Sequence, residues 1–260
     1  GHRTSWGPVI SADGRVVGGW WGGTETPIRP RSIRGSAFHG INTVRLWCVA
    51  RDRGFTSPTW ATADQWMLRG QRPAPWESPV AAVVYRPLRI ATTRRGYPSI
   101  VRIIRPLMLF NANQLMHSAF RSICPTPRIS IHHLFDLLAF HCTHELAGEQ
   151  VVNDTHTLLS ALVTWTGAPE RLARRTWHRE RSGAAVREEM IAELGAAYIS
   201  ADFGVDAQPD YRFIDTSRWV QLLRQDPRAV FAIAADAERA AQFVRRMKRE
   251  QMLQWARRPS

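Results

Sequence analysis

The chain has 260 residues, 44% of them hydrophobic, so it is long enough for one large or two smaller domains and is not a disordered protein. No apolar run reaches the roughly 20 residues of a membrane-spanning helix, and we expect no membrane partner. The three cysteines, Cys48, Cys124 and Cys142, form no Cys-x-x-Cys pair, which favours a cytoplasmic protein over a disulfide-stabilised secreted one.

The charge is unevenly distributed along the chain. Lys and Arg number 35 against 22 Asp and Glu, a formal net charge of +13. Residues 1–128 hold 18 arginines and 5 acidic residues, which accounts for the whole excess, whereas the remainder holds 17 residues of each sign. Segregation of this kind predicts a domain that meets a polyanion.

The N-terminal part is predicted to be mixed α/β. Residues 1–37, rich in Gly, Pro, Trp and Arg, indicate an extended arm with little regular structure. Apolar residues at helical spacing predict a helix over 41–53 that ends at Gly54. The other elements expected before residue 125 are a short helix at 61–68, strands at 80–85 and 100–104, and an apolar run at 107–110.

The C-terminal part is predicted to be helical throughout. Turn signals at Gly167-Ala168-Pro169, Gly204 and Asp226-Pro227 separate its segments. The expected helices cover residues 152–166, 184–203, 214–225 and 227–256. The segment around 124–150, which contains His132, His133, His141 and His144, follows neither pattern. The predicted fold class is therefore α+β, with domains at 1–125 and 126–260.

Three stretches of sequence stand out together. The first combines Phe38-His-Gly-Ile-Asn42 with Ser57-Pro-Thr-Trp60, and the second is Phe110-Asn-Ala-Asn-Gln114. The third covers 157–244 and includes Trp165-Thr-Gly167 and Arg187-Glu-Glu-Met-Ile-Ala-Glu193. In this order they resemble ArdC-type antirestriction proteins, which join an N-terminal single-stranded-DNA-binding domain to a zincin-like metallopeptidase domain. The resemblance covers most of the chain.

The resemblance implies a zinc site that this sequence lacks. Zincins carry His-Glu-x-x-His on one helix, where imidazoles at i and i+4 bind the metal and the glutamate is the general base. Alignment on Trp165-Thr-Gly167 places these positions at Ser160, Ala161 and Thr164. The resemblance makes Glu189 the third zinc ligand and Glu193 its partner, but one carboxylate cannot hold catalytic zinc. We therefore predict a pseudoenzyme with no catalytic residues, no metal and no other cofactor.

Two histidines keep a rebuilt metal site open. His144-Glu-Leu-Ala begins like the zincin motif, but Gly148 stands where the second histidine belongs. A rebuilt site would bring His156, one helical turn before Ser160, to Glu189. The preferred interpretation of both is structural, a helix turn at His144 and a cap or surface position for His156.

Arginines interleaved with tryptophans favour single-stranded DNA as the polyanion, because bases stack on aromatic rings while guanidinium groups contact phosphates. Trp20 and Trp21, set among glycines, are the expected stacking residues, whereas Trp47 and Trp60 are expected in the core. The expected phosphate contacts are Arg29, Arg31, Arg34, Arg51, Arg53, Arg94 and Arg95. The family's basic, glycine-containing turn reads Arg72-Pro-Ala-Pro-Trp-Glu77 here, which indicates that some usual contacts are absent or relocated.

The function expected from the sequence is sequence-nonspecific binding of single-stranded DNA. The resemblance implies protection of incoming mobile DNA or handling of single strands during transfer. Two other functions stay open. One is a protein-interaction module with its partner in the former peptidase cleft, and the other is a residual metalloenzyme that uses His144 or His156 with Glu189.

Overall fold

The structure is a computed structural model that describes residues 9–10, 16–18, 28–91, 98–116, 155–176, 182–207 and 217–256. The chain divides into two compact units. The sheet unit consists of Pro30–Phe38 and Asp52–Cys124, and the helical unit consists of Gly1–Arg29, His39–Arg51 and Pro125–Ser260. Among the described residues, no helix is both long enough and apolar enough to cross a membrane.

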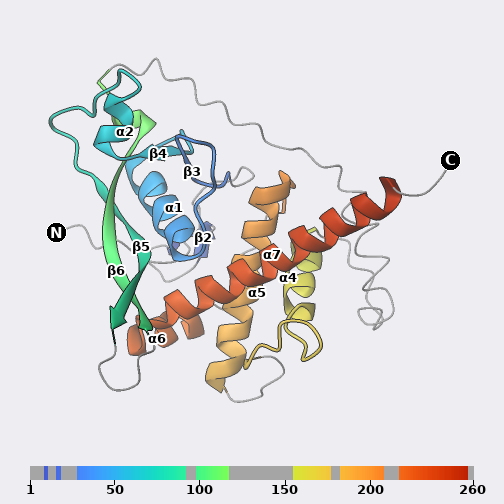
Figure 1. Ribbon diagram of the computed structural model, residues 1–260. Coiled ribbons are helices and arrows are strands. Elements are labelled where there is room, and N and C mark those ends of the chain that lie inside the picture. Colours follow the sequence, from blue (N-terminus) through green and yellow to red (C-terminus); the bar gives the residue numbers. More distant parts are fainter. Residues whose placement is uncertain are drawn as a thin grey trace. The chain divides into compact units, whose positions relative to one another are not determined.

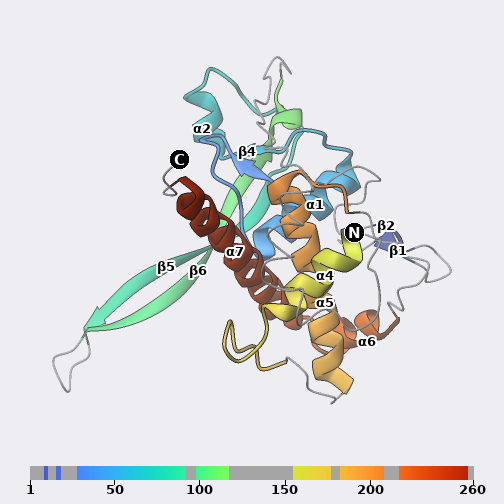
Figure 2. The same cartoon turned by 90° about the vertical axis from the view of Figure 1, so that its right-hand side faces the viewer.

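A four-stranded sheet with the order β3–β4–β6–β5 forms the sheet unit (Figure 1). β3 (Arg31–Ser32) runs parallel to β4 (Thr59–Ala61), and β6 (Pro98–Asn111) is antiparallel to both β4 and β5 (Val80–Ala91). Because β4 pairs only with the last two residues of β6, the rest of β5 and β6 is a two-stranded hairpin. Figure 2 shows this hairpin extending away from α2 and β4.

Both hairpin strands are longer than the apolar runs in the sequence indicated. β6 continues through Pro106, so the expected strand at 100–104 and the apolar run at 107–110 belong to one strand. Pro106 pairs with Val83, and Pro87 pairs with Arg102. A proline lacks the backbone N–H that a strand between two neighbours would need. Among the described residues, these parts of β5 and β6 pair only with each other, so the prolines are tolerated.

Trp66 is the centre of a small core in the sheet unit. It lies on α2 (Ala63–Met67), which begins with a capping box because the Thr62 and Gln65 side chains each accept from the other's backbone N–H. The fully buried indole donates to the Phe110 carbonyl oxygen at 3.0 Å. The other buried residues of this core are Ala61, Ala112 and Leu115. The short helix predicted here is thus confirmed with fewer residues.

The helical unit contains helices from both parts of the sequence. They are α1 (Ile41–Arg53), of which residues 41–51 belong to this unit, α4 (Thr155–Trp165), α5 (Ser182–Phe203), α6 (Ser217–Gln225) and α7 (Ala229–Ala256). Two short antiparallel strands, β1 (Val9–Ile10) and β2 (Val16–Gly18), also belong to it. The four C-terminal helices confirm the predicted segments, and Gly204 follows α5 with a φ of 64° as the turn signal indicated.

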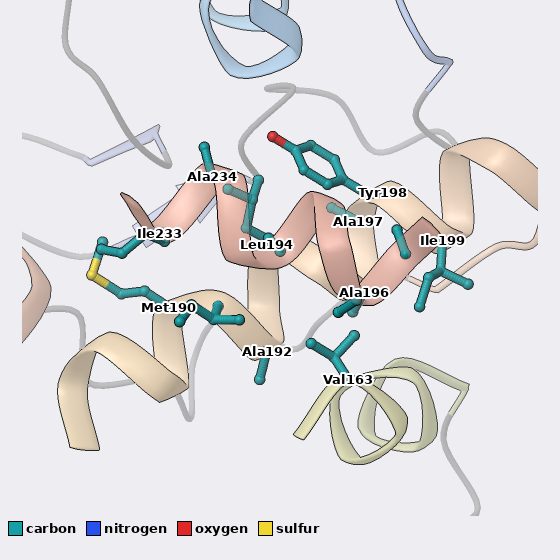
Figure 3. Packing of buried hydrophobic residues seen from close by; sticks show 14 of the residues in the cluster. Val163, Met190, Ala192, Leu194, Ala196, Ala197, Tyr198, Ile199, Ile233 and Ala234 are labelled. Atoms are coloured by element: carbon teal, nitrogen blue, oxygen red, sulfur yellow. The ribbon is translucent and has the colours of Figure 1, made fainter. Parts of the chain in front are cut away.

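Small residues allow α4 and α5 to pack closely. Val163 of α4 points toward Ala192 and Ala196 of α5 (Figure 3). A Cβ atom on Gly195 would lie 2.7 and 2.8 Å from the two methyl groups of Val163. The two helices therefore approach to a distance that requires glycine at this position.

α1 is part of the helical core, although it comes from the basic part of the sequence. Ile41, Val44 and Trp47 are buried in the same cluster as residues of α5 and α7. The ring centroids of Trp47 and Tyr198 lie 5.6 Å apart, and the Tyr198 hydroxyl donates to the Gly40 carbonyl oxygen at 2.8 Å. The compact units therefore differ from the expected division at 125/126, because the apolar face of α1 packs against C-terminal helices.

Candidate functional site

Three polar residues, His156, Ser160 and Thr164, lie one helical turn apart on α4, and the last two occupy the ligand positions of the zincin motif. His156 Nε2 lies 2.9 Å from Glu193 Oε2 on α5, and the Ser160 hydroxyl donates to Glu193 Oε1 at 3.4 Å. The side chains of His156 and Glu193 are only 11% and 13% exposed. Thr164, the third residue, donates its hydroxyl to the Ser160 carbonyl oxygen of its own helix at 3.1 Å. An imidazole–carboxylate pair therefore joins α4 to α5 here.

A cap or surface position was the preferred interpretation of His156, but the residue is buried, and the Glu189 partner that a rebuilt metal site would need is not the one observed. The partner of His156 is Glu193, one turn further along α5, while Glu189 is half-buried. The sequence placed both carboxylates near α4, but it did not determine which of them His156 would meet.

The described side chains of this region do not fit a catalytic zinc site. Ser160 and Thr164 offer hydroxyls where imidazoles would bind, and Ala161 offers no general base. His156 and Glu193 supply two potential ligands, and the described part of the chain contains no group of three or more His, Cys, Asp or Glu side chains placed to hold a metal. His144 lies outside the described residues, so the absence of a metal stays a prediction.

Arg174 closes the C-terminal end of α4. Its buried guanidinium donates to the carbonyl oxygen of Val163 at 2.7 Å and to the hydroxyl of Thr166 at 2.7 Å. The same group forms an ion pair with Glu188 of α5. Nothing in the sequence singled out this arginine. Together with the His156–Glu193 pair, it connects α4 and α5 through protein side chains alone.

Arg29 was predicted to contact phosphate, and this prediction is wrong. Its side chain is fully buried in the helical unit. It donates to Asp202 Oδ2 at 3.1 Å and to Glu238 Oε2 at 2.8 Å, and its Cζ atom lies 4.1 Å from the centre of the Tyr198 ring. A buried guanidinium with two carboxylate partners is a structural ion pair and is not accessible to nucleic acid.

Glu238 is the most connected residue of this ionic cluster. His39 Nδ1 lies 3.0 Å from Oε1, the Gly40 N–H donates to Oε2 at 3.1 Å, and Arg245 Nη2 lies 2.9 Å from Oε1. Burial is the largest single influence and by itself raises the pKa of Glu238. The hydrogen bond from His39, the charge and hydrogen bond of Arg29 and the Gly40 N–H act against burial, and the pKa lies well below its usual range. We call Arg29, Asp202, Glu238 and Arg245 the Arg29 cluster.

The remaining predicted phosphate contacts are dispersed. Arg34 and Arg53 are exposed in the sheet unit, and Arg53 donates to the Ser78 carbonyl oxygen at 3.0 Å. Arg31 is half-buried and donates to the Gly35 carbonyl oxygen at 3.1 Å. Arg51 is half-buried on α1, within the helical unit. Trp20, Trp21, Arg94 and Arg95 lie outside the described residues.

The sheet unit is the basic part of the protein. It contains twelve arginines and three acidic residues and no lysine, a formal net charge of +9 out of +13 for the chain. Arg69, Arg72 and Arg105, which the sequence did not single out, have exposed side chains. Each of these arginines is isolated in the sequence, beside turn residues or within a strand. Their contribution to the charge becomes visible only when the charges of the whole sheet unit are added.

The segment Phe110-Asn-Ala-Asn-Gln114 positions two loops of the sheet unit. The Asn111 side-chain amide donates to the Ser57 carbonyl oxygen, and the Asn113 side chain accepts from the Ser57 N–H, both at 2.8 Å. Gln114, almost fully buried, donates to the Ser78 carbonyl oxygen at 3.0 Å. The conformations around 57 and 78 are thus fixed by side chains from one short segment.

Both parts of the chain match known domain families. Residues 11–97 match the N-terminal domain of anti-restriction factor ArdC, and residues 148–236 match the zincin-like metallopeptidase family MPTase-PolyVal. The fold is similar to the metal-free crystal structure of the antirestriction protein ArdC from plasmid R388. The TM-score is 0.71 at 21% identity, over 90% of this chain and 92% of that one. The Mn(II)-bound form of the same protein gives a TM-score of 0.68. The protein thus combines an ArdC-type N-terminal domain with a zincin-like fold.

Proteins with similar sequences come from bacteria. Protein y4eC of Sinorhizobium fredii, itself uncharacterised, is 25% identical over 256 residues, which cover 84% of this chain and 80% of that protein. A DNA primase TraC of Escherichia coli is 32% identical over 96 residues, which cover 37% of this chain but only 9% of the primase. The two domain matches, in this order along the chain, together with the similar fold support an ArdC-type family member, as the sequence resemblance implied.

Proposed function

We propose that this ArdC-type protein binds single-stranded DNA without sequence preference through its sheet unit. The observation that carries the proposal is the concentration of charge: a net +9 in one compact unit, with Arg34, Arg69, Arg72 and Arg105 exposed. Guanidinium groups on a surface of this kind contact phosphates, and phosphate contacts carry no sequence information.

The names of similar proteins support DNA as the partner. One similar structure is an antirestriction protein, and one similar sequence belongs to a DNA primase. A role in protecting incoming mobile DNA in the cytoplasm, or in handling its single strands, follows from this family relation and forms part of the proposal.

Salt dependence of binding to a labelled oligo-dT strand tests this function. Each phosphate contact to a single strand contributes about 0.7 to the slope of log K against log salt. Replacing both Arg34 and Arg105 by alanine is expected to weaken binding and to reduce this slope by about 0.7 for each phosphate that is no longer bound. Fluorescence anisotropy over a series of salt concentrations measures both effects.

Arg218→Ala is the matched control, because Arg218 is an exposed arginine on α6 of the helical unit. It is expected to bind like the wild type. Equal effects of the control and the double variant would contradict the proposal. So would tighter binding of the wild type to polyglutamate than to the oligonucleotide, which would favour a protein partner.

We further propose that the zincin-like part neither holds zinc nor hydrolyses peptides. Ser160, Ala161 and Thr164 support this, because two hydroxyls and a methyl group replace the two ligands and the base. Protein purified without chelator is expected to contain far less than one zinc per chain by elemental analysis, and to leave casein uncleaved. Stoichiometric zinc in the wild type would contradict the proposal.

The matching control restores the ligands. A variant with Ser160→His and Thr164→His carries two imidazoles at i and i+4 on the helix that Glu193 contacts, and it is expected to bind more zinc than the wild type. Failure of this folded variant to bind more zinc would contradict the assignment of these positions as the former ligand sites.

A further inference from the structure

Trp76 stands apart from the other described tryptophans near it in the sequence. Its side chain is 78% exposed, whereas Trp47, Trp60 and Trp66 are buried. Covering an exposed indole ring with a flat apolar partner lowers the free energy, because apolar surface is removed from water.

The turn that carries Trp76 is held firmly at both ends. The Ala74 N–H donates to the Gln114 carbonyl oxygen at 2.8 Å, and the Glu77 N–H returns to the Ala74 carbonyl oxygen at 3.0 Å. The Gln114 side chain then donates to Glu77 Oε2 at 2.7 Å. Because Ala74 and Gln114 are buried, the turn is anchored in the sheet unit and presents the ring on a fixed base.

Cationic side chains lie next to this turn. Arg72 is exposed, and its carbonyl oxygen accepts from the Met116 N–H at 3.0 Å, which fixes its backbone. Arg53 reaches the far side of the turn, where it donates to the Ser78 carbonyl oxygen at 3.0 Å. Arg69, also exposed, follows α2 in the same segment. The turn that carries Trp76 therefore has Arg72 before it and the Arg53 guanidinium at its other end, where Arg53 also lies 4.0 Å from Glu77 Oε2.

We propose that Trp76, with Arg72 and Arg53 beside it, forms a base-stacking subsite for single-stranded nucleic acid. This inference rests on the proposed function of the sheet unit and adds a particular contact to it. A base offers the flat apolar face that covers an exposed indole, and the adjoining phosphates meet the guanidinium groups. Paired bases have both faces stacked within the duplex, so the subsite selects unpaired bases.

Three substitutions of Trp76 separate stacking from simple apolar contact. Trp76→Ala is expected to weaken binding to an oligo-dT strand by about 5- to 150-fold, the range that base stacking on an aromatic ring supplies. Trp76→Phe is expected to recover part of the loss, and Trp76→Leu is expected to recover little. The control is Leu68→Ala, because Leu68 is an 86% exposed apolar residue of the same unit and is expected to leave the affinity unchanged.

An oligonucleotide that keeps the phosphates but lacks the bases gives a second readout. On this abasic strand, wild type and Trp76→Ala are expected to bind equally, because the subsite has no base to hold. Arg72→Ala is expected to weaken binding to both strands and to lower the salt slope by about 0.7.

The two proposals fail in different ways. A wild type that binds no single strand at all contradicts the proposed function. A wild type that binds normally while Trp76→Ala binds equally well contradicts only the stacking subsite. Full recovery by Trp76→Leu, or an equal loss on the abasic strand, also overturns stacking, and circular dichroism confirms that each variant is folded.

Discussion

Arg29 and its partners join parts of the chain that are distant in sequence. Asp202 and Glu238 follow Arg29 by 173 and 209 residues, yet both accept hydrogen bonds from its guanidinium. Removing one member of a buried ion pair leaves the other charge uncompensated, which typically costs about 3–5 kcal/mol. Arg245 also contacts both carboxylates, so the two positive and two negative charges of the Arg29 cluster neutralise each other.

Glu238→Gln is expected to lower the stability at neutral pH by roughly 3 kcal/mol. The pKa of Glu238 in the folded protein is lower than in the unfolded chain, where it is about 4.3. Its contribution to stability is therefore complete above the unfolded value and is lost as the pH falls below it. Urea unfolding at a series of pH values measures this. The wild type is expected to lose stability on acidification more steeply than the variant.

Glu170→Gln serves as the control for acid stability, because Glu170 is exposed and outside the Arg29 cluster. Its stability curve is expected to follow that of the wild type. Parallel curves for Glu238→Gln and the wild type would show that the cluster does not couple folding to this carboxylate.

At the scale of the elements, α4 and α5 are the pair whose geometry is most tightly constrained. Gly195 removes the side chain where the helices are closest, and Val163 fills the space. His156–Glu193 and Arg174–Glu188 then connect the same two helices through polar groups. Since these contacts need no metal ion, side chains of the protein alone hold the two helices in this arrangement.

Gly195→Ala is expected to destabilise the protein, although alanine is the better helix former by about 1 kcal/mol. The added methyl group would meet the β-branched Val163, which has little freedom to move in a helix, and overpacking typically costs about 1–3 kcal/mol. Adding Val163→Ala removes the two methyl groups in the way. The double variant is expected to be more stable than the sum of the single effects.

Gly183→Ala is the control on the same helix, because a methyl group there meets open space. It is expected to leave the melting temperature unchanged or slightly raised. Additive effects of Gly195→Ala and Val163→Ala in thermal unfolding would show that the two helices do not meet as closely as the structure indicates.

At the scale of the whole molecule, the sequence predicted the elements better than their partners. α1 ends at Arg53, directly before Gly54, and the C-terminal helices begin and end near the turn signals, because these signals act locally. The hairpin was underestimated, since arginines and prolines interrupt its apolar pattern without interrupting its pairing. The fold class, α+β with a zincin-like helical part, is as predicted.

For the predicted site residues too, local features were predicted better than contacts between distant parts of the chain. The assignment of Ser160 and Thr164 to the ligand positions and of Ala161 to the base position follows from a motif with fixed spacing within one helix. Arg29 was wrongly assigned to the surface because the carboxylates that bury it are encoded far away. The sequence did not identify Trp76 as an exposed tryptophan. The exposure of an apolar residue depends on which other residues fill the core, and this is known only from the folded structure.

The chain passes between the two compact units at residues 29–30, 38–39, 51–52 and 124–125. The two matched domains, residues 11–97 and 148–236, are continuous in the sequence, whereas each compact unit is assembled from separate segments. A fragment that stopped near residue 125 would leave the apolar face of α1 without the helices that cover Trp47, and the remaining fragment would keep Asp202 and Glu238 without Arg29. In this protein, exchange of either half by recombination would thus break the core of the helical unit, which ties the inheritance of the basic half to that of the zincin-like half.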